Sequence, residues 1–174
     1  MGNGCRGHDM IEASDISKQI QASVESLRKT MPDVCYAALI DTAIEVEGEA
    51  KTLVPHKSSN LSRSITHEGD KPTMTVMVGT NTEYGPYVEY GTGIFSEFPS
   101  APKTRITPKV KKALSWLSGG ERITVKSIAG MTPRPFLRPA FLVKGANFGK
   151  NLDYEMDKQG IAQKAQDSAK KVSK

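Results

Sequence analysis

Few side chains of this 174-residue chain have the types and the spacing that metal chemistry requires. Cys5 and His8 have the two-residue gap of many metal ligand pairs, but no second pair follows at the spacing of a zinc site. Asp153, Glu155 and Asp157 form an acidic cluster without the turn glycine and the distal glutamate of a calcium loop. We therefore predict no metal site, and we expect the acidic cluster to be a solvated helix face.

Groups that could catalyse a reaction are equally incomplete. Gly91, Thr92 and Gly93 lack the longer glycine pattern and the Lys-Ser/Thr pair of a phosphate-binding loop. No serine occupies a nucleophile elbow. We predict no catalytic residue and no cofactor, and we expect a protein that is not an enzyme.

Length and composition indicate one domain, or one domain with an arm. The chain is long enough to bury a core without disulfide bonds or a structural metal, so its two cysteines look incidental. This cysteine usage fits synthesis in a reducing cytoplasm. No run of about 18 apolar residues occurs, and residues 1–10 lack the apolar stretch of a signal peptide, so we predict neither a membrane span nor secretion.

The charge is unevenly distributed along the chain. Residues 1–54 hold five basic and nine acidic residues, a net charge of −4, whereas residues 55–174 hold 19 and 10, a net charge of +9. Such asymmetry can indicate nucleic-acid binding, and it equally suits a protein whose opposite faces meet different partners in an assembly. Because the basic residues are scattered along the sequence rather than clustered, we favour an assembly.

Two successive helices are predicted in the first third of the chain. An apolar stripe at helical spacing defines the first, and it consists of Ile16, Ile20, Val24, Leu27 and Met31. Thr30 and Asp33 have the spacing of a capping box and Pro32 fits a first turn, so a second helix should begin there and end at Pro55. Its stripe consists of Tyr36, Leu39, Ile40, Ala43, Val46, Ala50 and Leu53.

Alternating polar and apolar residues predict hairpins further along. Residues 61–68 and 73–78 form the first, around a turn at residues 69–72, with its apolar face on the second helix. Residues 93–109 are proline-rich and irregular. Residues 112–117 fit either a short helix or a strand, but the turn at residues 118–120 favours a second hairpin.

A last helix is expected to open at Pro139 and to carry Phe141, Leu142, Leu152 and Met156, although Gly145, Gly149 and Gly160 weaken it. The predicted fold class is α+β, with N-terminal helices, a small antiparallel β-sheet with hairpins, and a C-terminal helix. We divide the chain into an N-terminal arm and helix (residues 1–31, of which 1–8 are a loose arm), an α+β domain (32–165) and a flexible tail (166–174).

Three segments are more distinctive than the rest: residues 55–65, 78–92 and 135–140. The second contains Tyr84, Tyr87, Glu89, Tyr90, Gly91 and Thr92, and the third is Pro135, Phe136, Leu137, Arg138, Pro139 and Ala140. In this order, the segments resemble the small tail-completion or head-tail joining (neck) proteins of long-tailed double-stranded DNA bacteriophages, the phage morphogenesis family labelled putative tail component. The resemblance covers roughly residues 32–145 and does not extend to residues 1–29, and Ser59 stands where the family usually has glycine.

These motif residues are predicted to have a structural role. In a helical turn started by Pro86, Tyr84, Tyr87 and Tyr90 would share a face, as a core cluster or as a subunit interface, and Gly91 would end the turn in a left-handed conformation. Phe136 and Leu137, held between prolines, are expected to plug into the core.

Glu89 lies in an apolar sequence setting, where an unpaired carboxylate is costly to bury. We therefore expect it to meet Arg138 or Arg134, or to cap backbone amides.

The resemblance implies a structural virion protein of the phage neck, made in the host cytoplasm, that joins the DNA-filled head to the tail tube. It implies a homo-oligomeric ring, most simply a hexamer, with a head-completion or adaptor protein and the tail tube or tail terminator as partners, and no membrane. We expect residues 93–109 and the N-terminal arm to reach the neighbouring ring or subunit. Deletion of residues 94–107 should then abolish joining and leave a folded domain.

Two alternatives stay open. A tail terminator is also a small ring protein at the top of the tail, and the sequence does not separate it from a joining protein. A basic nucleic-acid-binding accessory protein would use the downstream region of charge +9, and its affinity would fall steeply with salt. A neck ring can also touch passing DNA weakly and nonspecifically, so only tight and selective binding would favour this alternative.

Overall fold

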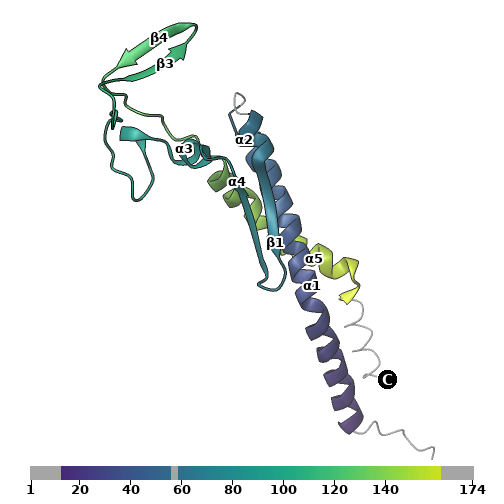
Figure 1. Cartoon of the computed structure of the whole chain (residues 1–174). Helices are drawn as coiled ribbons and strands as arrows, with labels where there is room; N and C mark the ends of the chain where they lie inside the picture. The colour runs from purple at the N-terminus through teal and green to yellow at the C-terminus, as the bar shows by residue number, and fades with distance from the viewer. Residues whose placement is uncertain (1–12, 56–58, 162–174) are drawn as a thin grey trace, which may run out of the picture.

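One long helix, α1 (Ala13–Leu53), forms the axis of the protein in the computed structural model, which describes residues 13–55 and 59–161 (Figure 1). The helix has 41 residues and continues through Pro32, so the expectation of two separate helices is wrong. The boundary placed between residues 31 and 32 falls inside this helix.

Packing explains why Pro32 does not end α1. A proline inside a helix costs about 3 kcal/mol, because a hydrogen bond is lost and the ring crowds the preceding turn. Directly after it, Val34 and Ala38 are fully buried, and this apolar burial offsets the cost. Thr30 does not cap a second helix, since its hydroxyl donates to the Ser26 carbonyl at 2.9 Å.

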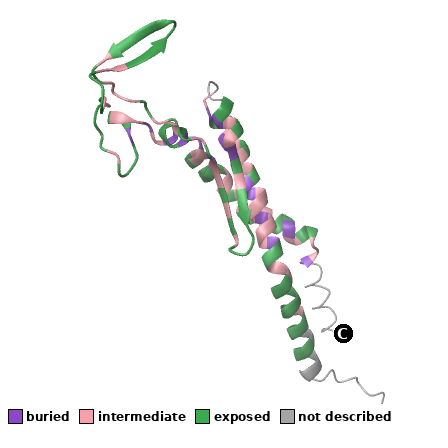
Figure 2. Cartoon of the chain, in the orientation of Figure 1, coloured by how far each residue is buried: buried purple, intermediate pink, exposed green. Residues whose placement is uncertain are grey.

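The first half of α1 extends beyond the other described elements and is exposed (Figure 2). Ile20, Val24 and Leu27 of the predicted apolar stripe are all exposed. The residues that the structure describes therefore leave these three side chains exposed, whereas Met31 at the end of the stripe is half-buried.

After α1, the chain forms a short helix, α2 (Ser59–Ser64), and only then the strand β1 (Ile65–Asp70). The strand predicted for residues 61–68 therefore begins four residues too early. Leu61 and Ile65 are both buried, and their spacing of four fits a helical turn as well as a strand. Their pattern alone could not distinguish the two.

β1 pairs with β2 (Thr75–Thr80) in the predicted antiparallel hairpin, with Ile65 opposite Thr80. The hairpin lies along α1 (Figure 1), and this confirms its expected position. The turn is later than predicted, because β1 continues through Gly69 and Asp70. Gly69 lies close to α1, and a side chain there would displace Tyr36 and Ile40 from their positions.

The middle of the chain projects away from α1 (Figure 1). It begins with α3 (Gly85–Tyr90) and η1 (Gly93–Phe95), followed by a largely irregular segment, as predicted. The second hairpin is confirmed as β3 (Leu114–Ser118) and β4 (Glu121–Val125), so the ambiguous residues 112–117 enter a strand. Its turn residues Gly119 and Gly120 have φ of +59° and +87°, the signs that a tight hairpin turn requires.

The last predicted helix is two helices. α4 (Leu137–Lys144) begins two residues before Pro139, and α5 (Phe148–Lys158) follows after the 3₁₀ turn η2 (Gly145–Asn147). The interruption begins at Gly145, the first of the glycines expected to weaken the helix.

Amide side chains fix α5 and η2 on α1. Asn147 Nδ2 donates to Glu45 Oε2 at 2.6 Å, and Asn151 Nδ2 donates to Thr42 Oγ1 at 3.0 Å. The hydrogen bond from Asn147, together with a second bond from Asn151 Nδ2 to Glu45 Oε1 at 3.3 Å, lowers the pKa of the Glu45 carboxyl from its ordinary value.

The hydrophobic core lies where the second half of α1 meets α2, β1 and α4. Its buried members are Val46, Ala50, Val54, Leu61, Ile65, Phe136 and Ala140. Phe136 is the largest of the fully buried side chains, which confirms its predicted role as a plug. The core thus ties the N-terminal helix to the segment that returns from the projecting part of the chain.

The α+β fold class is confirmed, with two separate two-stranded antiparallel sheets instead of one sheet. Among the described residues, no helix combines the length and the apolarity needed to cross a membrane. The predictions for residues 1–8 (including Cys5 and His8) and for residues 166–174 lie outside the described residues.

Candidate functional site

The three distinctive segments meet beside the second half of α1. Leu61 and Ile65 of the first and Phe136 of the third lie in one core cluster, and Val88 of the second packs against it. Gly85 allows this approach, because a Cβ there would lie 2.5 Å from Thr80 Cγ2 and 3.6 Å from Leu61 Cδ1. Segments that are far apart in the sequence therefore form one structural site.

The carboxylate of Glu89 is the polar centre of this site, and only 3% of the residue is exposed. Its Oε2 accepts hydrogen bonds from the backbone N–H groups of Phe136 (2.7 Å) and Leu137 (3.0 Å). Its Oε1 accepts from the backbone N–H and from Nε of Arg138, both at 3.1 Å. We call this arrangement the Glu89 clasp, and it confirms the expected partners Arg138 and backbone amides, though not the Arg134 side chain.

The Glu89 clasp caps helix α4 from a distance. Phe136 is the N-cap residue of α4 and offers no side-chain hydrogen bond of its own. The first N–H groups of a helix have no partner within it, so they need an acceptor from elsewhere. Glu89 supplies it from α3, and its negative charge is favourable at the positive end of the helix.

Burial and hydrogen bonding act in opposite directions on the pKa of Glu89. Burial by itself raises the pKa of the carboxyl, because it penalises the charged form. The hydrogen bonds from the amides of residues 136–138 and from the Arg138 side chain together lower it, and the net pKa lies below the ordinary value. Glu89 is therefore a carboxylate at neutral pH, suited to holding structure.

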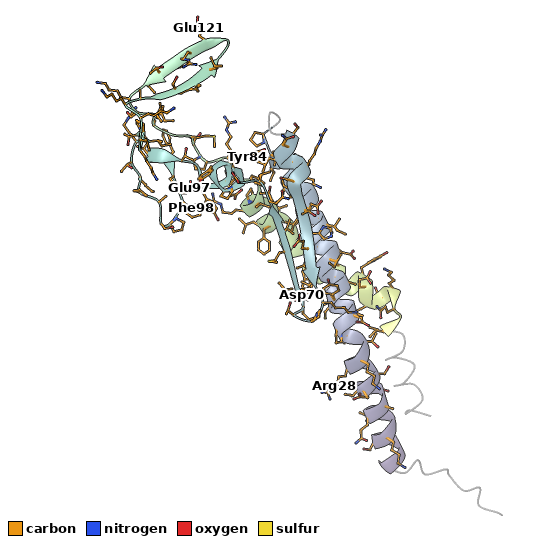
Figure 3. The ribbon with its side chains drawn as sticks, in the orientation of Figure 1. Arg28, Asp70, Tyr84, Glu97, Phe98 and Glu121 are labelled. Atoms are coloured by element: carbon orange, nitrogen blue, oxygen red, sulfur yellow. The ribbon has the colours of Figure 1, made fainter. Side chains whose placement is uncertain are left out.

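Arg138 extends the clasp to the segment after α3. Its Nη2 donates to the backbone carbonyl of Glu89 at 3.2 Å and to Glu97 Oε2 at 2.9 Å. Its guanidinium also lies 4.9 Å from the centre of the Tyr90 ring, a cation–π distance. Figure 3 shows Glu97 and Phe98 beside α3, on the chain that leaves toward the second hairpin.

Residues 91–133, which we call the distal lobe, leave and return to the body through a close backbone crossing. The Thr92 N–H donates to the Met131 carbonyl, and the Met131 N–H donates to Thr92 Oγ1, both at 2.9 Å. Gly93 (φ +66°) and Gly130 (φ +106°) face each other here, and a side chain on either would collide with the opposing backbone. The Gly91-Thr92-Gly93 sequence therefore allows the two backbone segments to pass close to each other and to form hydrogen bonds.

Gly91 has the positive φ predicted for it, at +70°, but its ψ of −178° is extended and not left-handed helical. Close approach matters here as well, because a Cβ at Gly91 would lie 2.7 Å from the Met131 carbonyl oxygen. Glycine at this position thus ends α3 and leaves room for the irregular segment around Met131.

The three motif tyrosines do not share one environment. Tyr90 packs against Phe98 in an edge-to-face arrangement, with ring centres 4.9 Å apart. Tyr84 and Tyr87 are 42% and 58% exposed, so they are not core residues. Tyr87 and Phe98 also border an open, mostly apolar hollow of about 500 Å³.

The acidic cluster on α5 is partly different from the prediction of a solvated face. Asp153 and Asp157 are exposed, but Glu155 is buried and accepts a hydrogen bond from Lys158 Nζ at 2.8 Å. In the described part of the chain, no three His, Cys, Asp or Glu side chains are grouped as metal ligands would be.

Residues 18–91 match the family model described as Bacteriophage HK97-gp10, putative tail-component. The match begins within α1, upstream of the expected start at residue 32, and ends at Gly91. It therefore contains Tyr84 to Gly91 but not the Pro135–Pro139 segment that completes the Glu89 clasp. Neither the curated proteins nor the solved structures yield a match to the chain. Residues 18–91 of this chain are thus similar to the HK97-gp10-like family of phage tail components.

Proposed function

We propose that this protein is a structural, non-enzymatic subunit of the phage neck that joins the DNA-filled head to the tail tube. The observation that carries the proposal is the match of residues 18–91 to a tail-component family, over the segment that forms α1, the first hairpin and α3. Its partners would be further copies of the chain, a head-completion or adaptor protein, and the tail tube or tail terminator.

Exposed apolar side chains at separate places support assembly into a ring. Ile20 and Val24 lie on the protruding half of α1, and Phe141 and Leu142 lie on α4, and all four are more than half exposed. Exposed apolar groups that cluster commonly mark contact sites. Subunits of a closed ring meet through two different surfaces of each copy, which fits two such places on one elongated chain.

Tyr84 and Tyr87 are the motif residues best placed for contact with a neighbouring subunit. Both are exposed; Tyr84 is the N-cap residue of α3 and Tyr87 lies within it. The Glu89 clasp fixes this helix to the start of α4. Rigid aromatic side chains bury much area at a low entropic cost, and they often dominate interface energies.

Replacing both tyrosines (Tyr84→Ala with Tyr87→Ala) is expected to abolish assembly and leave the fold intact. Each exposed aromatic anchor can contribute about 2 kcal/mol to a contact, so the pair would weaken subunit affinity by about a thousandfold. The readout is the infectious titre of a phage lacking this gene, rescued by the variant from a plasmid. Tyr154→Ala on α5, where the tyrosine is also exposed, is the matched control and should rescue normally. Normal rescue by the double variant would refute the role of this face.

The loop of residues 94–107 is a less clean target than the sequence indicated. It contains Glu97, which binds Arg138, and Phe98, which packs on Tyr90. Ile106 in the same loop also bridges to Ile128. Its deletion would remove these internal contacts together with any contact to a partner, so substitution of exposed residues is the sharper test.

A further inference from the structure

The distal lobe carries the net positive charge of the whole chain. Residues 91–133 hold seven of the 24 Lys and Arg residues and two of the 19 Asp and Glu residues. The rest of the chain therefore holds 17 of each and is neutral. All seven basic residues of the lobe lie between residues 103 and 126.

These seven cations have no carboxylate partner in the part of the chain that the structure describes. All are exposed, and within residues 13–55 and 59–161 none forms an ion pair; they are Lys103, Arg105, Lys109, Lys111, Lys112, Arg122 and Lys126. Of the two acidic residues, Glu97 is bound to Arg138, and Glu121 lies at the outer end of the hairpin (Figure 3). The lobe thus carries an uncompensated positive charge, which attracts anions.

Four of the cations gather at the inner end of the β3–β4 hairpin. Lys111 and Lys112 lie three and two residues before β3, and Lys126 directly follows β4; these strand ends are paired through Leu114 and Val125. Arg105 joins them, because its Nε donates to Ser127 Oγ at 3.0 Å. We call Arg105, Lys111, Lys112 and Lys126 the basic cluster.

The hairpin above the basic cluster is a two-stranded ribbon with no flanking strand, and it stands away from the body (Figure 1). A ribbon of two strands is narrow enough to enter the major groove of DNA. One of its faces is largely polar, since Ser115 lies opposite Thr124 and Leu117 lies opposite Arg122. Cations at the inner end would then meet the phosphates that border the groove.

We propose that the distal lobe binds the phosphate backbone of double-stranded DNA, with the hairpin against the duplex and the basic cluster on the phosphates. This inference goes beyond the neck function and does not rest on it. Binding is nonspecific, because contacts to phosphate carry no sequence information.

The test measures binding of the full chain to a fluorescent duplex of arbitrary sequence across a salt series. Four phosphate contacts release counterions such that affinity falls by about 150-fold between about 50 and 200 mM salt. The chain has a single tryptophan, Trp116, which lies in β3 and is 42% exposed. Its fluorescence should therefore change when DNA binds, which reports contact at the lobe itself.

The variant with Arg105, Lys111, Lys112 and Lys126 all changed to Gln should lose this binding and most of its salt dependence. A second variant retains Arg105, so that its hydrogen bond to Ser127 is preserved, and it should lose about three quarters of the salt slope. The control changes four exposed cations outside the lobe to Gln, namely Arg28, Arg63, Arg134 and Lys150, and has the same net charge. It should bind DNA like the parent.

Three outcomes would overturn the proposal. The first is no binding by the parent at about 50 mM salt, where phosphate contacts are strong. The second is an equal loss in the control, which would mean that net charge and not this cluster governs binding. The third is tighter binding to polyglutamate than to the duplex, which would assign the lobe to an acidic protein surface.

Discussion

Glu89→Gln is expected to lower the free energy of unfolding by about 2 to 4 kcal/mol, because it removes the charge of a buried carboxylate that accepts four hydrogen bonds. The glutamine keeps the size of the side chain, but its NH₂ group replaces one of the two carboxylate oxygens, each of which now accepts two hydrogen bonds. Donors would then face donors at the start of α4. Urea unfolding followed by far-ultraviolet circular dichroism measures the change.

Glu97→Gln is the matched control, because Glu97 binds the same arginine from a half-exposed position. Exposed ion pairs contribute less than about 1 kcal/mol, so this variant should remain close to the parent. Equal stability of the Glu89→Gln variant and the parent would show that the clasp does not hold α3 and α4 together.

Comparison of the parent with the Glu89→Gln variant also separates the pH dependence of Glu89 from that of the other carboxylates. Because the folded pKa of Glu89 is lowered, its stabilisation is complete above the unfolded pKa of about 4.3 and is lost as the pH falls through the folded pKa. The stability difference between parent and variant should therefore be constant near neutrality and shrink in acid. A difference that grows in acid would contradict the sign of the shift.

Phe136→Ala is expected to destabilise the protein by about 3 to 5 kcal/mol, since it leaves a cavity in a small core. Phe136 is fully buried and belongs to the cluster that joins α1, α2, β1 and α4. Phe141→Ala, five residues later on α4, removes the same group from a position that is 66% exposed. It should change the stability by less than about 0.5 kcal/mol, and a comparable loss in both variants would refute the assignment of the core.

Sequence patterns predicted those elements whose residues fit one period only. The exposed Thr75 and Met77 alternate with the less exposed Val76 and Val78 in β2, as expected, and Gly119 with Gly120 marked the second hairpin. The spacing of Leu61 and Ile65 fits both a helix and a strand. The predicted strand was wrong for residues 61–64, which belong to α2, and right from Ile65 onward. The helix break predicted at Pro32 was wrong for another reason. The preference of proline for the first turn of a helix was outweighed by the burial of the residues that follow it in α1.

Within the site, Glu89 was predictable because a carboxylate in an apolar setting requires donors. That requirement left Arg138, Arg134 and backbone amides open as partners, and the structure shows Arg138 and the amides. The crossing of Gly93 and Gly130 and the second partner of Arg138, Glu97, were not foreseen. Each depends on how the distal lobe turns back on itself, which brings together residues that no local spacing relates.

Electron microscopy of particles from a phage that lacks this gene is the most direct test of the proposed neck function. Joining of head to tail by this protein predicts filled heads lying beside finished, unattached tails, and supply of the parent gene from a plasmid should restore whole particles. Overlong tails would instead indicate a tail terminator. Normal virions in the absence of the gene would contradict a role in the neck altogether.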